Sequence, residues 1–158
     1  MNLRFQYAWG GAVGTWTTTS REVPINAWSH VAVTYTPSGT GANPVVYVNG
    51  VSVALDEDTA PSGANDQQDD THDLYIGNNY GAARTFDGYL ADVKIYDATT
   101  VTAAQVQAMA SKINVDKDDP RIPAVGASNT GLVGWYKFNA STTADSSGES
   151  NTLTAANM

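Results

Sequence analysis

Apolar and polar residues alternate along several short stretches of this chain. Residues 28–35 alternate with a period of two, which is the period of a β-strand. Neither face of this stretch is strongly polar, so it is predicted to be a central strand buried on both sides. A second strand is predicted near the N-terminus, and its apolar face is made of Leu3, Phe5, Tyr7 and Trp9.

The pattern continues as two β-branched runs on either side of Asn49-Gly50. Asn-Gly readily adopts the positive φ angles of a type I′ turn, so a tight hairpin is predicted here. Further strands are expected at 15–19, 73–77 and 89–96, and residues 56–72 are expected to form a long exposed loop because polar residues, Pro and Gly dominate them.

One helix is predicted after the last of these strands. Thr102 and Gln105 have the spacing of a capping box, in which each residue's side chain accepts from the backbone N–H of the other. The apolar residues Val106, Met109 and Ile113 then fall on one stripe, which should dock on the sheets. The helix is expected to end near Lys112, and residues 114–130 resemble a linker.

Four blocks resemble laminin G-like domains of the concanavalin A-like lectin/glucanase superfamily in order and spacing. They are Trp28–Tyr35, Val46–Gly50, Leu74–Gly77 and Phe86–Tyr96. The resemblance implies an all-β fold, an antiparallel β-sandwich of the jelly-roll, concanavalin A-like kind with one short helix. It implies little about function, because this fold hosts lectins, adhesion modules, glycosidases and structural spacers.

A fifth block stands out of order. Residues 131–138 and the turn that follows them resemble the opening strand of the same family, but here they come last. We therefore expect three parts: a sandwich body at 1–113, a linker at 114–130 and a C-terminal strand segment at 131–158. The strand could fold back onto its own body, insert beside a neighbouring subunit, or be the start of the next unit of a tandem array. The candidate assembly residues are Leu132, Val133, Trp135, Tyr136 and Phe138.

Charge and composition exclude some partners. The formal net charge is -8, with only eight Lys and Arg in 158 residues, so neither nucleic acid nor an anionic membrane is an expected partner. The sequence contains no cysteine, which makes the fold independent of an oxidising compartment. Residues 1–9 lack the basic and apolar regions of a secretory signal. This is expected for a virion protein released by lysis or for a chain cut from a precursor.

The sequence predicts no catalytic residues. Glycosidases of this fold place acidic residues on one strand face as Glu-x-Asp-x-Glu, because two carboxyl groups about 5 Å apart must flank the scissile bond. Here Glu22, Glu57 and Glu149 are isolated in predicted turns or loops. His30 is expected to play a core or hydrogen-bonding role, and His72 has no second ligand at a suitable spacing.

Calcium is a possible ligand, and no other cofactor is expected. Carboxylates cluster in the predicted loop, where hard oxygen ligands suit Ca²⁺. The candidate ligands are Asp56, Asp58, Asp69, Asp70 and Asp73. The alternative is a solvated acidic loop. Glycans are a second possible ligand, with Trp9, Trp16, Tyr80 and the amides of 78–79 as the candidate platform, although strand tryptophans usually serve packing.

These expectations point to a non-catalytic β-sandwich module on a virion or extracellular surface. Small size, acidity, lack of cysteine and the displaced strand favour a bacteriophage decoration, fibre or knob component that self-associates or caps a larger assembly. The alternative is a carbohydrate-binding or adhesion module of a secreted bacterial protein.

Overall fold

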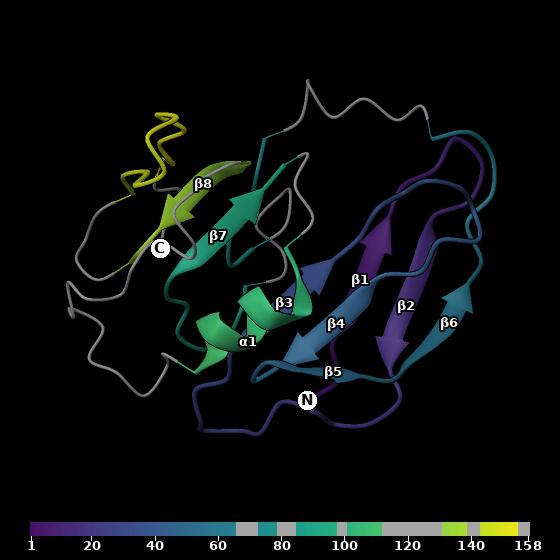
Figure 1. Cartoon of the computed structure of the whole chain (residues 1–158), viewed down its shortest axis with the longest axis horizontal. Helices are drawn as coiled ribbons and strands as arrows, with labels where there is room; N and C mark the ends of the chain where they lie inside the picture. The colour runs from purple at the N-terminus through teal and green to yellow at the C-terminus, as the bar shows by residue number, and fades with distance from the viewer. Residues whose placement is uncertain (66–72, 79–84, 98–100, 112–130, 139–142, 155–158) are drawn as a thin grey trace. The chain divides into compact units, whose positions relative to one another are not determined.

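The computed structural model describes residues 1–65, 73–78, 85–97, 101–111, 131–138 and 143–154 (Figure 1). The chain divides into two compact units, and each is described by itself. The first unit comprises Met1–Gln67 and Thr100–Ser128, and the second comprises Gln68–Thr99 and Asn129–Met158. The predicted division into 1–113, 114–130 and 131–158 stays a prediction.

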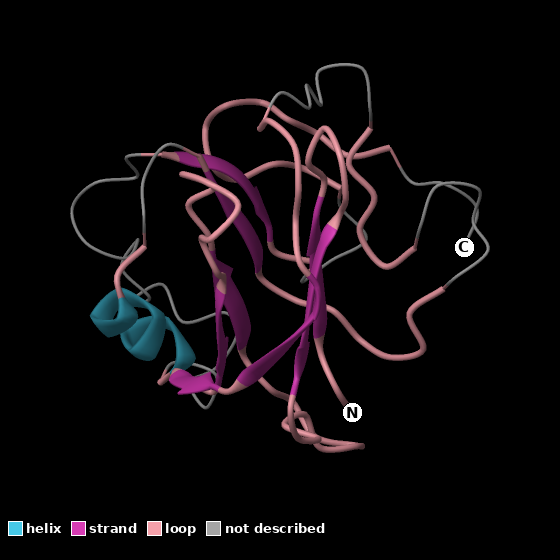
Figure 2. Ribbon diagram, turned by 90° about the vertical axis from the view of Figure 1, so that its right-hand side faces the viewer, coloured by secondary structure: helices cyan, strands magenta, loops and turns pink. Residues whose placement is uncertain are grey.

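The first unit contains two antiparallel three-stranded sheets. One has the order β1-β2-β6, formed by β1 (Arg4–Tyr7), β2 (Gly14–Thr18) and β6 (Leu55–Thr59). The other has the order β3-β4-β5, formed by β3 (Val31–Thr34), β4 (Val45–Val48) and β5 (Val51–Val53). Seen from the side, these strands lie in two layers (Figure 2).

Aromatic rings join the two layers of the first unit. The Trp16 side chain is only 1% exposed, and its ring lies 6.0 Å from that of Phe5 and 5.7 Å from that of Tyr35. Tyr35 directly follows β3, whereas Phe5 and Trp16 belong to the opposite sheet. Since such ring pairs add to the stabilisation from apolar burial, this cluster is the core of the unit. The expected antiparallel β-sandwich with one short helix is confirmed.

The Asn49-Gly50 hairpin forms as predicted. Both residues have positive φ angles, 51° and 82°, and they join β4 to β5 in a register that pairs Val48 with Val51. Helix α1 (Ala103–Ala110) lies against this turn, because a Cβ atom added to Gly50 would be 3.0 Å from the Ala110 Cβ. The turn therefore needs glycine both for its conformation and for the approach of the helix.

The predicted capping box of α1 is confirmed. The Gln105 N–H donates to the Thr102 hydroxyl at 3.3 Å, and the Thr102 N–H donates to the Gln105 Oε1 at 2.8 Å. Val106 is fully buried, as its place on the predicted stripe required, while Ile113 lies outside the described residues. The helix ends about two residues earlier than expected, at Ala110.

The second unit contains a two-stranded antiparallel sheet of β7 (Val93–Tyr96) and β8 (Leu132–Tyr136). The register pairs Val93 with Tyr136 and Lys94 with Trp135, and it shifts between Ile95 and Tyr96. In this structure the displaced C-terminal strand therefore pairs with a strand of its own chain.

The prediction of a central strand at 28–35 was wrong. Only Val31–Thr34 form a strand, and it stands at one end of the order β3-β4-β5. Val31 and Val33 are 42% and 41% exposed, and β4 takes the central position. Alternation reports which faces are apolar but not how many neighbours a strand has, so the pattern could not distinguish an edge from a centre.

Three other boundaries differ from the expectations. Residues 56–59 of the predicted loop belong to β6, because β2 offers an edge and the acidic side chains can stay in solvent. Residues 73–77 do not form a strand in the part of the chain that the structure describes. The strand predicted at 89–96 begins only at Val93.

No helix in the described part of the chain is long and apolar enough to span a membrane.

Candidate assembly site at the C-terminal strand

Strand β8 carries most of the residues predicted for assembly. Leu132 and Tyr136 are buried, while Val133 and Trp135 are partly exposed, so the strand alternates between a packed face and an accessible face. Phe138 lies beyond the strand with a φ of 50°, and its ring stacks on that of Tyr136 at 6.3 Å. The structure thus brings all five predicted residues together on one ribbon.

The edge of β8 that does not face β7 is closed by the turn that follows the strand. The Trp135 N–H donates to the Asp145 Oδ1 at 2.9 Å, and the Ser146 N–H donates to the Trp135 carbonyl at 2.8 Å. The Asn151 side-chain amide donates to the Val133 carbonyl at 2.7 Å. An open edge would offer these groups to another strand, so the turn protects β8 from unwanted pairing.

Asp145 holds the turn together. Its carboxylate accepts from the Ser147 hydroxyl at 2.7 Å and the Ser147 N–H at 2.8 Å, and also from the Asn151 N–H at 2.9 Å. Partial burial raises the pKa of Asp145, but the donors of Ser147, Trp135 and Asn151 outweigh it and lower the pKa to about 2. The carboxylate therefore stays ionised at neutral pH and acts as a structural acceptor.

The turn also reaches the buried face of β8. The Tyr136 hydroxyl donates to the Asn151 carbonyl at 2.7 Å. Burial, with a smaller contribution from the charge of Asp145, raises the pKa of Tyr136, so the phenol keeps this proton. The turn is thus fixed to the strand through both backbone and side-chain groups.

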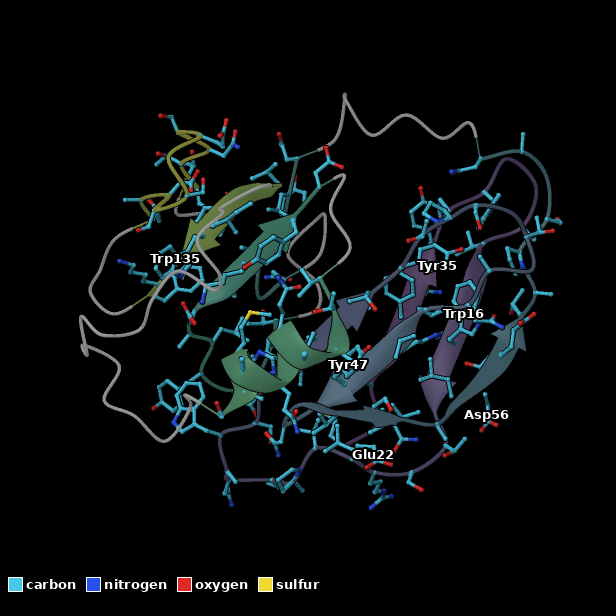
Figure 3. The ribbon with its side chains drawn as sticks, in the orientation of Figure 1. Trp16, Glu22, Tyr35, Tyr47, Asp56 and Trp135 are labelled. Carbon is cyan, nitrogen blue, oxygen red and sulfur yellow. The ribbon has the colours of Figure 1, made fainter. Side chains whose placement is uncertain are left out.

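The accessible face of β8 presents the indole of Trp135 (Figure 3), and two lysine side chains flank it. The Lys94 and Lys137 ammonium nitrogens lie 4.8 Å and 4.4 Å from the centroid of the Trp135 ring. Lys94 is the cross-strand partner of Trp135, and Lys137 is two residues further along the chain. Such contacts contribute about 0.5–1 kcal/mol each at an exposed site.

Asp92 completes this cluster from the residue before β7. Its carboxylate accepts from the Lys94 ammonium at 2.7 Å and from the Trp135 indole N–H. Lys137 is exposed, and within the described ranges it has no ion pair. We call these four residues, Asp92, Lys94, Trp135 and Lys137, the Trp135 cluster.

The candidate calcium ligands do not converge where they can be followed. Asp56 and Asp58 lie on β6, and Asp58 accepts from the Thr17 hydroxyl at 2.6 Å. Asp73 is exposed in the second unit, and Asp69 and Asp70 lie outside the described residues. Among the residues that the structure describes, no three metal-ligating side chains are grouped to hold an ion. A calcium site that uses the remaining loop stays a prediction.

The candidate glycan platform is only partly visible. Trp9 and Trp16 are buried, so neither ring offers a face to a sugar, while Tyr80 and Asn79 lie outside the described residues. Asn78 donates from its amide to the Thr85 hydroxyl at 3.3 Å. Glycan binding at this site stays a prediction.

Two of the three glutamates belong to one compact unit and the third to the other. Glu22 and Glu57 belong to the first unit and Glu149 to the second, and His72 lies outside the described residues. The His30 N–H donates to the Asn49 side chain at 3.0 Å, which places its backbone beside the hairpin turn.

Sequence reasoning missed Asp92, Lys94, Lys137 and Asp145 as members of the site. Asp145-Ser-Ser-Gly148 has the composition of a turn in which an Asp side chain accepts from N–H groups two residues on, and that signal could have identified Asp145. No sequence signal identified the two lysines, because the contact of Lys94 with Trp135 depends on the register of β7 and β8.

Comparison with known proteins shows the family of this chain. A laminin G family model, described as the concanavalin A-like lectin/glucanases superfamily, matches residues 2–107, which is more than half of the chain. No curated protein and no solved structure matches.

Proposed function

The chain belongs to the concanavalin A-like lectin/glucanases superfamily, and on that premise we propose that it is a non-catalytic module that contributes a contact surface to an external assembly. The observation that carries this proposal is the way β8 is held. β7 pairs with one edge of the strand, and the Asp145 turn occupies the other. The strand thus displays the Trp135 cluster on a fixed backbone, which favours recognition by a partner.

The cluster has the composition of a contact surface. Aromatic residues are enriched at protein interfaces, where they supply a large contact area at low entropic cost. Lys137 adds a charge with no ion-pair partner among the described residues, on a protein whose formal net charge is -8. An acidic surface of another subunit, or of another copy of this chain, would complement it.

Among external assemblies we favour the surface of a bacteriophage particle, as a decoration, fibre or knob component. The acidity of the chain and its lack of cysteine support this choice. The proposed location is therefore a virion or an extracellular surface, and the proposed partners are copies of the chain or other subunits.

Sedimentation velocity at micromolar concentration tests self-association. We expect species larger than a monomer, weakened by Lys137→Glu and unaffected by Arg21→Glu, which makes the same charge change at an exposed residue of the first unit. A monodisperse monomer would overturn the self-association, and equal loss in both variants would show that only net charge matters. Gold-labelled antibodies on particles from the source would then test the location. Binding on a glycan array would instead favour a carbohydrate-binding module.

A further inference from the structure

The first unit contains a pocket where the chain passes from one sheet to the other. Only Ala54 separates β5 from β6, which belong to different sheets. The pocket at this crossing has a volume of about 330 Å³, which lies within the range of small-molecule sites. Its apolar lining includes Trp16, Pro44, Val53 and Leu55, and Asn43 and Glu57 add polar groups.

Glu57 lines this pocket from the edge strand β6, and it is exposed to solvent. Glu57 is the register partner of Trp16, whose ring is buried between the sheets, so the two side chains share a face. Asp56 and Asp58 alternate with it and face outward, where the Thr17 hydroxyl donates to Asp58. A bulge between Thr15 and Trp16 lies at this same point of the ladder. Such bulges re-aim side chains and are frequent beside binding sites.

The floor of the pocket is fixed in place. The Trp16 indole N–H donates to the Asn43 Oδ1 at 2.9 Å and ties β2 to the residues that precede β4. The amide oxygen of Asn43 can accept a second hydrogen bond, because a carbonyl oxygen has two lone pairs. Asn43 and Glu57 thus add two acceptors to a pocket whose surface is about as polar as it is apolar.

We propose that this pocket binds a primary alkylammonium group, with the alkyl chain against Pro44, Val53 and Leu55 and the ammonium beside Glu57 and Asn43. An ammonium provides three donors and a positive charge, and its alkyl chain can bury along an apolar surface. A bare metal ion fits less well, because the described lining offers one carboxylate, whereas Ca²⁺ takes several oxygen ligands. The net charge of -8 attracts cations to this surface.

Two sources share this chemistry: the side chain of a lysine on a protein, and a free polyamine. The site does not depend on the proposed assembly role, although a lysine of a neighbouring subunit is one of its possible occupants.

Amide and indole N–H chemical shifts test the proposal on the whole chain. The probes are N-acetyl-lysine methylamide for a lysine side chain, putrescine for a polyamine, and N-acetyl-norleucine methylamide, which lacks the ammonium. We expect the lysine probe or putrescine to shift the Trp16 indole and the Asn43 side-chain amide. Whichever binds more tightly identifies the source. Removal of the ammonium should weaken binding about tenfold, as for a hydrogen bond to a charged group.

Two variants distinguish binding in this pocket from a general effect of the protein's negative charge. Glu57→Gln should weaken the binding of the better probe about tenfold, and Asp56→Asn should leave it within twofold, because it removes the same charge from the outer face of the same strand. Matching thermal unfolding of the variants and the parent would show that both fold. Three results would overturn the proposal: no chemical-shift change at millimolar probe, equal binding of the norleucine probe, or equal effects of the two variants. Glu57 would then be a charged residue that only protects a sheet edge.

Discussion

The backbone N–H of Trp135 donates to the carboxylate of Asp145, which follows it by ten residues, at 2.9 Å. This bond joins the accessible face of the C-terminal strand to the turn that closes its edge. A strand that resembles the first strand of a laminin G-like domain is thus held in its own chain on both sides, by β7 and by the turn. Exchange of β8 into a neighbouring subunit would require the turn to open.

Replacement of Asp145 tests the closing of this edge. Asp145→Ala removes the acceptor of four hydrogen bonds and exposes the backbone groups of Trp135 and Val133. We expect a melting temperature lower by about 2–4 °C, the order of shift that a modest destabilisation gives in a chain of this length. We also expect increased self-association through the opened edge. Differential scanning fluorimetry and light scattering measure the two effects. Asp145→Asn keeps one acceptor oxygen and should be intermediate, and an unchanged Asp145→Ala protein would contradict the role of the turn.

Acid should weaken the same turn. The pKa of Asp145 is lowered from its ordinary value of 3.8 to about 2 in the folded protein, so the ionised carboxylate stabilises the fold above pH 3.8. That contribution falls as the pH drops below 3.8 and is lost as the pH passes through 2. We expect the Trp135 amide resonance to report the change in a titration from pH 5 to pH 1.5. In Asp145→Asn this step should be absent, whereas a titration midpoint near 4 in the parent would show that the donors do not hold the carboxylate.

Gly50 should tolerate no side chain. Its φ of 82° is costly for other residues, and an added Cβ would lie 3.0 Å from both the Ala110 Cβ and the Gln107 Cα. We expect Gly50→Ala to lower the free energy of unfolding by about 1–3 kcal/mol in urea denaturation. Gly39→Ala is the matched control, because nothing lies within 4 Å of its added Cβ and it has no positive φ. Similar losses in both variants would contradict the close packing of α1 on the hairpin.

The sequence predicted structure correctly where the interacting residues are close together along the chain, and failed where they are far apart. The Asn49-Gly50 turn and the Thr102–Gln105 cap depend on residues a few positions apart, and both were predicted correctly. The edge position of β3 and the strand at 55–59 depend on distant partners, which alternation does not encode. The candidate assembly residues of β8 were proposed from a resemblance to the family's opening strand, and their role in assembly stays a prediction. Lys94 could not be found in this way, because it meets Trp135 only through the pairing of β7 with β8.

The capping box of α1 can be tested by substitutions that change only its two reciprocal hydrogen bonds. Thr102→Ala removes the hydroxyl that accepts from the Gln105 N–H, and it should lower the free energy of unfolding by about 1 kcal/mol. Thr102→Ser keeps that acceptor and should lose much less. Gln105→Ala leaves the Thr102 N–H without its side-chain partner, so the two alanine substitutions should be less than additive when combined, because both act on one reciprocal pair. Urea denaturation of the three alanine variants and the serine variant measures this coupling. Strict additivity would mean that the two hydrogen bonds act independently and that the box does not start the helix as a unit.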